Sequence, residues 1–69
     1  MAEFYVEINA QENGEHIVHN ATCSHLPAKE VIQYLGAISN CASALKKASE
    51  RFKQVNGCPH CAVACHAAA

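Results

Sequence analysis

A shortage of large apolar side chains is the feature that most constrains how this chain can fold. The 69 residues include only fourteen Leu, Ile, Val and Phe, and the hydrophobic fraction reaches 51% because thirteen alanines and five cysteines raise it. A chain this short buries roughly 60% of the surface that its unfolded state exposes. A core this thin usually needs a disulfide, a metal ion or oligomerisation to hold it. The five cysteines and five histidines are the residues that can supply such a link.

The cysteine count and the first residues bear on the compartment. Five cysteines cannot all pair within one chain. Residues 1–7 have neither the basic region nor the apolar run of a secretory signal, and no stretch reaches the length of a membrane span. We therefore expect a cytoplasmic protein with no membrane contact. In such a compartment, clustered Cys and His indicate metal binding or catalysis rather than disulfides.

Three strands are expected in the first half of the chain. Residues 4–8 alternate between apolar and polar, which is typical of a strand with one buried face. Asn13-Gly14 favours a hairpin turn, since both residue types adopt positive φ, and residues 15–18 read as the returning strand. The β-branched and aromatic residues at 31–35, followed by Gly36, favour a third strand. Together they predict a small antiparallel three-stranded sheet.

The second half shows helical spacing. Ser39 or Asn40 suits an N-cap. The apolar stripe that follows consists of Cys41, Leu45, Ala48, Phe52 and Val55. This pattern predicts a long helix that stops at Asn56-Gly57, and then a short C-terminal helix from Pro59 to about residue 67. The expected fold is therefore a single α+β domain, residues 1–69, with one long helix and one short helix beside the sheet and a metal ion joining them.

Two pairs of residues have the spacing of metal ligands. Cys58-Pro59-His60-Cys61 places two thiols on one tight turn, so both can face a single tetrahedral ion. His19-x3-Cys23 follows the predicted hairpin and supplies a second pair. Three thiolates and one imidazole are a regular ligand set for structural zinc. We therefore predict one Zn²⁺ per chain, bound by His19, Cys23, Cys58 and Cys61, and we assign no catalytic residue.

Other histidines and cysteines leave alternatives open. His25 can replace His19 because it lies close to Cys23 in sequence, and Cys65 can replace it because Cys65 follows Cys61 by one helical turn. Cys41 lies on the apolar stripe and is expected in the core, since free cysteine is among the most buried residue types. Cys65 is also a candidate disulfide partner for Cys41. The roles of Cys41, Cys65 and His66 stay open on the sequence alone.

The order of these features resembles a known family. A hairpin, a His-x3-Cys loop, a strand, a helix beginning near Ser39-Asn40 and a Gly57-Cys58-x2-Cys61 segment are similar to the small zinc modules related to the metal-binding domain of the bacterial alkylation-repair protein Ada. The resemblance covers about residues 15–62 and implies the same four ligands. Ada has a cysteine where this chain has His19, and the basic surface here is weak. The transfer of a methyl group from DNA phosphotriesters is therefore not carried over.

Two further functions compete with structural zinc binding. Cys58-Pro59-His60-Cys61 is identical in sequence to the active-site motif of strongly oxidising periplasmic thioredoxin relatives. In those proteins the start of a helix stabilises the first thiolate. Here only eight residues follow Cys61, so the thioredoxin scaffold is absent. Weak nucleic-acid binding would use Lys46, Lys47, Arg51 and Lys53, but a formal net charge of −1 gives no basic footprint. The preferred function is a non-enzymatic zinc module with an unknown protein partner or a tendency to self-associate.

Overall fold

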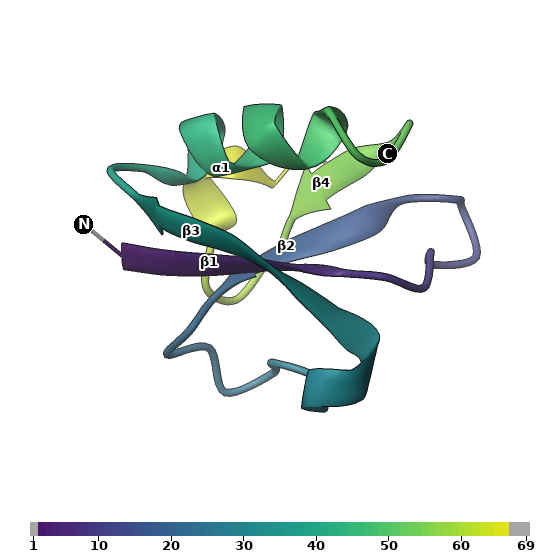
Figure 1. Ribbon diagram of the computed structural model, residues 1–69, viewed down its shortest axis with the longest axis horizontal. Coiled ribbons are helices and arrows are strands. Elements are labelled where there is room, and N and C mark those ends of the chain that lie inside the picture. Colours follow the sequence, from purple (N-terminus) through teal and green to yellow (C-terminus); the bar gives the residue numbers. More distant parts are fainter. Residues whose placement is uncertain (1, 67–69) are drawn as a thin grey trace.

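Four strands form one mixed sheet in the computed structural model, which describes residues 2–66 (Figure 1). The strands are β1 (Ala2–Glu7), β2 (His16–Asn20), β3 (Ile32–Ile38) and β4 (Val55–Gly57). Their order across the sheet is β3-β1-β2-β4. Strand β1 is antiparallel to both β2 and β3, whereas β2 and β4 run parallel. The fold is α+β, but the expected three-stranded antiparallel sheet is wrong, because β4 adds a fourth strand in the parallel direction.

Strand β4 was not predicted because it is short and is held by main-chain hydrogen bonds. The backbone N–H of His16 donates to the carbonyl of Gln54, and the N–H of Cys58 donates to the carbonyl of Val18, both at 2.9 Å. These bonds flank a strand of only three residues, which is too short for an alternating pattern of side chains to be recognised. Asn56-Gly57 resembles a helix stop in the sequence and instead lies within the strand.

The helix is also shorter than expected. Helix α1 (Cys41–Ser49) has nine residues, and Asn40, one of the two N-caps that the sequence suggested, accepts the Ser43 N–H at 2.8 Å. Phe52 and Val55 follow its end, yet both still pack against the core. The apolar stripe therefore correctly identified residues that face the core, but the prediction of a long helix is wrong. The chain leaves the helix after Ser49 and reaches the same core in another conformation.

The expected C-terminal helix is reduced to one turn. Pro59 does not begin an α-helix; the only regular element after β4 in the described residues is the 3-10 turn η2 (Val63–Cys65). Ala62, with φ −132° and ψ 43°, has a non-helical backbone and separates η2 from the Cys58–Cys61 turn. Residue 67, where the expected helix ends, lies outside the described residues. The prediction of a short C-terminal helix is therefore also wrong.

Two glycines adopt positive φ and shape the strands. Gly14, at φ +88°, completes the turn between β1 and β2, whereas Asn13 keeps a negative φ. Gly36, at φ +125°, does not end the third strand but lies inside it, beside a bulge. Phe4 pairs with Gly36 and Tyr5 pairs with Tyr34, so Leu35 is the extra residue. The bulge turns Leu35 into the core, where it is 2% exposed.

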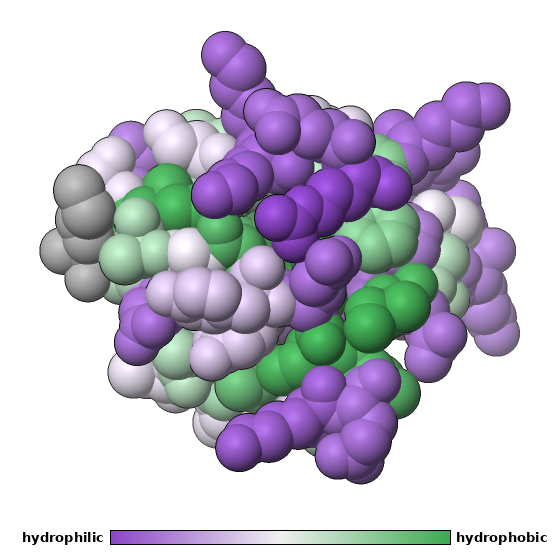
Figure 2. Space-filling model, viewed as in Figure 1, coloured by the Kyte–Doolittle hydropathy of each residue, from purple (hydrophilic) through white to green (hydrophobic). Residues whose placement is uncertain are grey.

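The core lies between the sheet and α1. It consists of Phe4, Val6, Val18, Leu35, Ala44 and Ala48. Helix α1 covers one face of the sheet, and the connection between β2 and β3 passes on the other side (Figure 1). Only alanines of α1 are fully buried, so the helix backbone approaches the sheet closely. In Figure 2 hydrophilic side chains gather at the top of the molecule, where α1 lies in the same view, and apolar residues show in separate patches below them.

A disulfide joins Cys41, at the start of α1, to Cys65 in η2. Cys41 also packs against the core, as the sequence predicted, and Cys65 takes the role of its partner. The compartment expected from the sequence stays a prediction. Among the described residues no helix is long and apolar enough to cross a membrane.

Candidate metal centre

The parallel pairing of β2 and β4 brings the two predicted ligand pairs to one edge of the sheet. Parallel strands end on the same side, so the residues that follow them become neighbours. His19 lies near the end of β2, and Cys23 lies in the turn after it. Cys58 comes directly after β4, and Cys61 follows on the next turn. Gly57 permits this turn, because a Cβ there would lie 2.9 Å from the Ala62 carbonyl oxygen.

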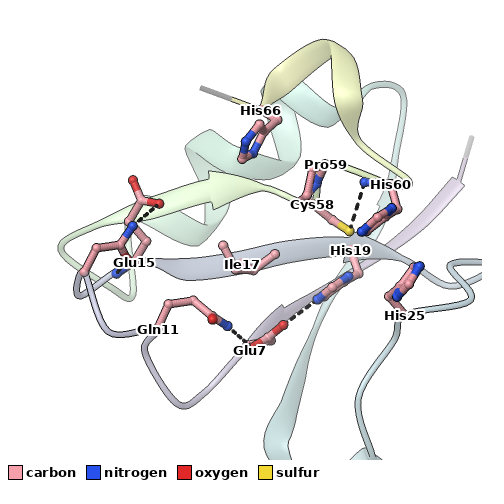
Figure 3. Close-up of a pocket in the computed structure, with 11 residues that line it drawn as sticks. Glu7, Gln11, Glu15, Ile17, His19, His25, Cys58, Pro59, His60 and His66 are labelled. Carbon is pink, nitrogen blue, oxygen red and sulfur yellow. Dashed lines mark hydrogen bonds and ion pairs between the residues drawn. The ribbon is translucent and has the colours of Figure 1, made fainter. Parts of the chain in front are cut away.

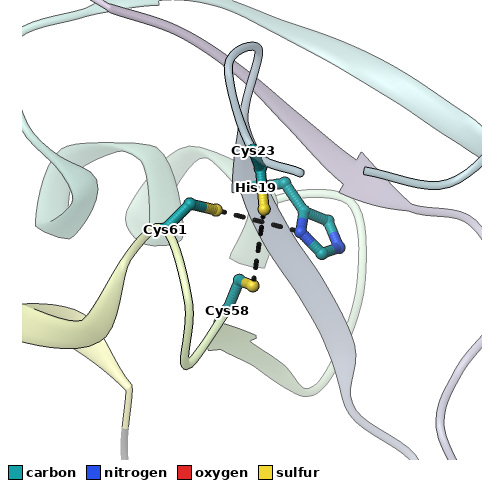
Figure 4. A group of neighbouring side chains, drawn as sticks. All are labelled: His19, Cys23, Cys58 and Cys61. Carbon is teal, nitrogen blue, oxygen red and sulfur yellow. Dashed lines mark hydrogen bonds between the residues drawn. The ribbon is translucent and has the colours of Figure 1, made fainter. Parts of the chain in front are cut away.

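The four side chains converge on a common point (Figure 4). One ligand atom from each of His19, Cys23, Cys58 and Cys61 lies within 4.8 Å of all the others. The sulfurs of Cys23 and Cys58 are 3.8 Å apart, and the Cys61 sulfur lies 3.9 Å from Nδ1 of His19. Tetrahedral zinc with Zn–S bonds of about 2.3 Å separates two sulfurs by about 3.8 Å. The group can therefore hold a metal ion with little rearrangement.

Backbone hydrogen bonds favour negative charge on the three sulfurs, whereas their burial opposes it. Cys23 and Cys58 are buried, and Cys61 is partly buried. Each sulfur accepts a hydrogen bond from a backbone N–H at 3.4 Å. Asn20 donates to Cys61, His25 donates to Cys23, and His60 donates to Cys58. Hydrogen bonds to the charged form favour a thiolate over a thiol, so the backbone compensates part of the penalty for burying charge.

The two thiols of the Cys58–Cys61 turn differ in acidity. Burial opposes ionisation of Cys58, but the backbone N–H groups of Cys61 and His60, together with the neighbouring thiols, outweigh it and lower the pKa of Cys58 below its usual value. Burial, and next the Cys23 thiol, raises the pKa of Cys61 to about 12. Of these two residues, Cys58 ionises first. A metal ion bound by both would have to displace the proton of Cys61.

Glu7 is a residue of this site that the sequence analysis missed. Its Oε2 lies 2.6 Å from Nε2 of His19, the ring nitrogen that faces away from Cys61. The alternation of residues 4–8 places Glu7 opposite the core-facing residues, and the predicted hairpin brings it near His19. The contact between Glu7 and His19 could have been predicted only from the register of the hairpin, and the sequence between the two strands left that register open.

The two proposed substitutes lie outside the ligand group. His25 is exposed and stacks on His60, with ring centroids 3.8 Å apart. Cys65 is engaged in the disulfide with Cys41. His60 is exposed, whereas His16 is partly buried and its ring stacks on that of Phe52, with ring centroids 4.0 Å apart. His66 bonds to the Gly57 carbonyl oxygen through Nδ1 at 2.8 Å.

An open hollow of about 360 Å³ lies beside the ligand group. Figure 3 shows Glu7, His19 and Ile17 along its floor and His25, His60 and His66 around it. Of the ligand group, His19 and Cys58 reach its lining. Because Cys58 is only 2% exposed, its sulfur is poorly placed to attack the disulfide of a partner protein. This geometry favours metal binding over thiol–disulfide exchange.

Comparison with known protein families, curated proteins and solved structures finds no match for this chain. The resemblance to the Ada metal-binding domain is therefore carried by the motif and element order alone. The structure brings His19, Cys23, Cys58 and Cys61 together into a group that can hold a metal ion. Their assignment as ligands stays a prediction.

Proposed function

We propose that this domain binds one Zn²⁺ through His19, Cys23, Cys58 and Cys61, and that the ion serves the fold rather than a reaction. The single observation that carries the proposal is the convergence of four ligand atoms within 4.8 Å from two chain regions far apart in sequence. Thiolate sulfur is a soft donor and imidazole nitrogen a borderline one, and both suit zinc, whereas Mg²⁺ and Ca²⁺ require oxygen ligands.

The completeness of the ligand set supports a structural role. Catalytic zinc sites keep one position for water or substrate, whereas structural sites take all four ligands from the protein. Here four protein donors are available, and three of them are buried. The similarity of the motif to Ada-like zinc modules supports the same conclusion without the methyl transfer. The domain would act as an accessory or interaction module, with another protein or a second copy as its partner.

Zinc content tests the proposal directly. We expect the purified wild-type protein to contain one zinc per chain by elemental analysis, and Cys58→Ser to lose it, because one of four ligands is removed. A matched control replaces Cys41 and Cys65 together by Ser. This double variant should keep its zinc while losing about 3 kcal/mol of unfolding free energy, the entropic value of closing a loop of 24 residues.

The opposite result would identify the competing function. A wild-type protein that contains no zinc after reconstitution, and whose Cys58 and Cys61 form a reversible disulfide, would contradict zinc binding. That outcome would support thiol–disulfide exchange instead. Mass spectrometry after alkylation of free thiols distinguishes the two states, because the zinc protein yields three reactive cysteines upon denaturation and the oxidised protein yields one.

A further inference from the structure

The shortest polar contact at the site involves a residue outside the ligand set. Oε2 of Glu7 and Nε2 of His19 are 2.6 Å apart, within the range of a strong hydrogen bond. The contact is shielded from water, since the side chains of His19 and Glu7 are 4% and 16% exposed. A carboxylate held this way interacts more strongly with its partner than the same pair in solvent. The contact is therefore a fixed feature of the site.

The sheet determines where Glu7 lies. Tyr5 pairs with His19 across β1 and β2, so Glu7, two residues further along β1, is the diagonal neighbour of His19 on the same face. The other carboxylate oxygen of Glu7 accepts a hydrogen bond from the Gln11 side chain at 2.9 Å. Figure 3 shows Gln11, Glu7 and His19 in one line along the floor of the hollow. Both oxygens of Glu7 thus have partners that orient the carboxylate.

We propose that Glu7 is a positioning residue that makes His19 bind the metal through Nδ1. An ionised carboxylate can only accept a hydrogen bond, so Nε2 of the neutral imidazole must carry the proton. The lone pair of the ring is then on Nδ1, the nitrogen that lies 3.9 Å from the Cys61 sulfur and faces the other ligands. Glu7 thereby selects the tautomer and fixes the ring plane. This inference rests on the zinc site proposed above.

The same contact strengthens the ligand as well as orienting it. A carboxylate that accepts the outer N–H of a metal-bound imidazole increases the electron density on the coordinating nitrogen. Loss of such an outer partner typically lowers metal affinity by about 10–100-fold. We expect Glu7→Gln to have an effect of this size on zinc affinity, because a neutral amide accepts the same hydrogen bond more weakly and also presents an N–H group that cannot bond to Nε2–H.

Competition with a chromophoric zinc chelator measures this effect. Glu7→Gln should weaken zinc binding by about 10–100-fold relative to wild type. Glu3→Gln is the matched control: it removes the same charge from the same strand, but Glu3 bonds to the hydroxyl of Tyr34 and not to His19. Its zinc affinity should equal that of wild type. Equal affinities for all three proteins would overturn the role of Glu7, whereas absence of zinc binding by wild type would overturn the zinc site itself.

Two further measurements separate positioning from a general structural effect. In a His19→Cys background, no imidazole remains to be oriented, so adding Glu7→Gln should leave zinc affinity unchanged if Glu7 acts through His19. Nitrogen NMR of the zinc-loaded wild type with isotopically labelled histidine should show His19 metal-bound at Nδ1 and protonated at Nε2. Coordination through Nε2, or an equal loss of affinity in both backgrounds, would contradict the proposal. The NMR measurement uses the wild-type protein, so it tests the proposal even if the His19→Cys variant does not fold.

Discussion

Removal of zinc with a chelator will unfold the domain, with loss of the circular dichroism of its sheet and helix. In zinc-finger peptides, metal binding supplies about 10–16 kcal/mol that becomes folding free energy. A core of this size rarely supplies more than about 3–5 kcal/mol, and only six of residues 2–66 make up its buried cluster. Adding zinc should restore the spectrum, whereas adding magnesium should not. A metal-free protein that keeps its circular dichroism and its NMR dispersion would contradict a structural role for the ion.

Acid should have the same effect as the chelator. The pKa of Cys61 without metal is raised to about 12, so this thiol is protonated throughout the neutral range and zinc binding must release its proton. Apparent zinc affinity should therefore fall at least about tenfold for each unit by which the pH is lowered. Without zinc, the effect of Cys61 on stability depends on pH in the opposite direction. The folded state holds the Cys61 proton more tightly than the unfolded chain does, so this contribution to stability is lost as pH rises towards 12. Zinc titrations at several pH values would show the slope.

Leu35→Ala will cause the second large effect, a loss of about 2–5 kcal/mol in the unfolding free energy of the zinc-loaded protein. Leu35 is 2% exposed and is the largest of the fully buried side chains. Truncation removes apolar contacts and leaves a cavity between the sheet and α1, which so small a core cannot readily close. Urea unfolding with zinc in excess measures the change.

Two comparisons make the Leu35 result specific. Val63→Ala truncates an apolar side chain that is 69% exposed, so its effect should stay within about 0.5 kcal/mol of zero. Leu35→Ala should still bind one zinc per chain, since Leu35 belongs to the core cluster and not to the ligand group. If Leu35→Ala destabilises no more than Val63→Ala, the packing described between the sheet and α1 is wrong.

The sequence could predict the two pairs of candidate ligands because their information is local. His19-x3-Cys23 and Cys58-x2-Cys61 are each contained in one short segment, and ligand chemistry then restricts which segments belong together. The Asn40 N-cap and the turn at Gly14 were recognisable for the same reason, since each depends on a few adjacent residues. In the structure the four side chains come together, Asn40 caps α1, and a turn forms at Gly14 without the positive φ expected at Asn13.

The parts that could not be predicted depend on contacts between distant segments. Phe52 and Val55 continue the helical spacing, and nothing in the spacing shows that the chain leaves the helix after Ser49. Strand β4 exists because its backbone finds β2, a choice that three residues cannot encode by themselves. The contact of Glu7 with His19 requires the register of the hairpin. The Cys41–Cys65 disulfide requires the position of η2 against α1.

The parallel edge strand β4 has a consequence for the order in which the molecule assembles. The hairpin of β1 and β2 joins neighbouring segments and can form early, whereas Cys58 follows its neighbour Cys23 by 35 positions. Closing so long a loop must be completed before the contacts across it contribute, which slows folding. With the proposed zinc site, either pair of ligands could capture an ion before the loop closes, and the ion would then hold the two ends together. The proposed zinc site would therefore make the folding rate, as well as the final stability, depend on the zinc concentration.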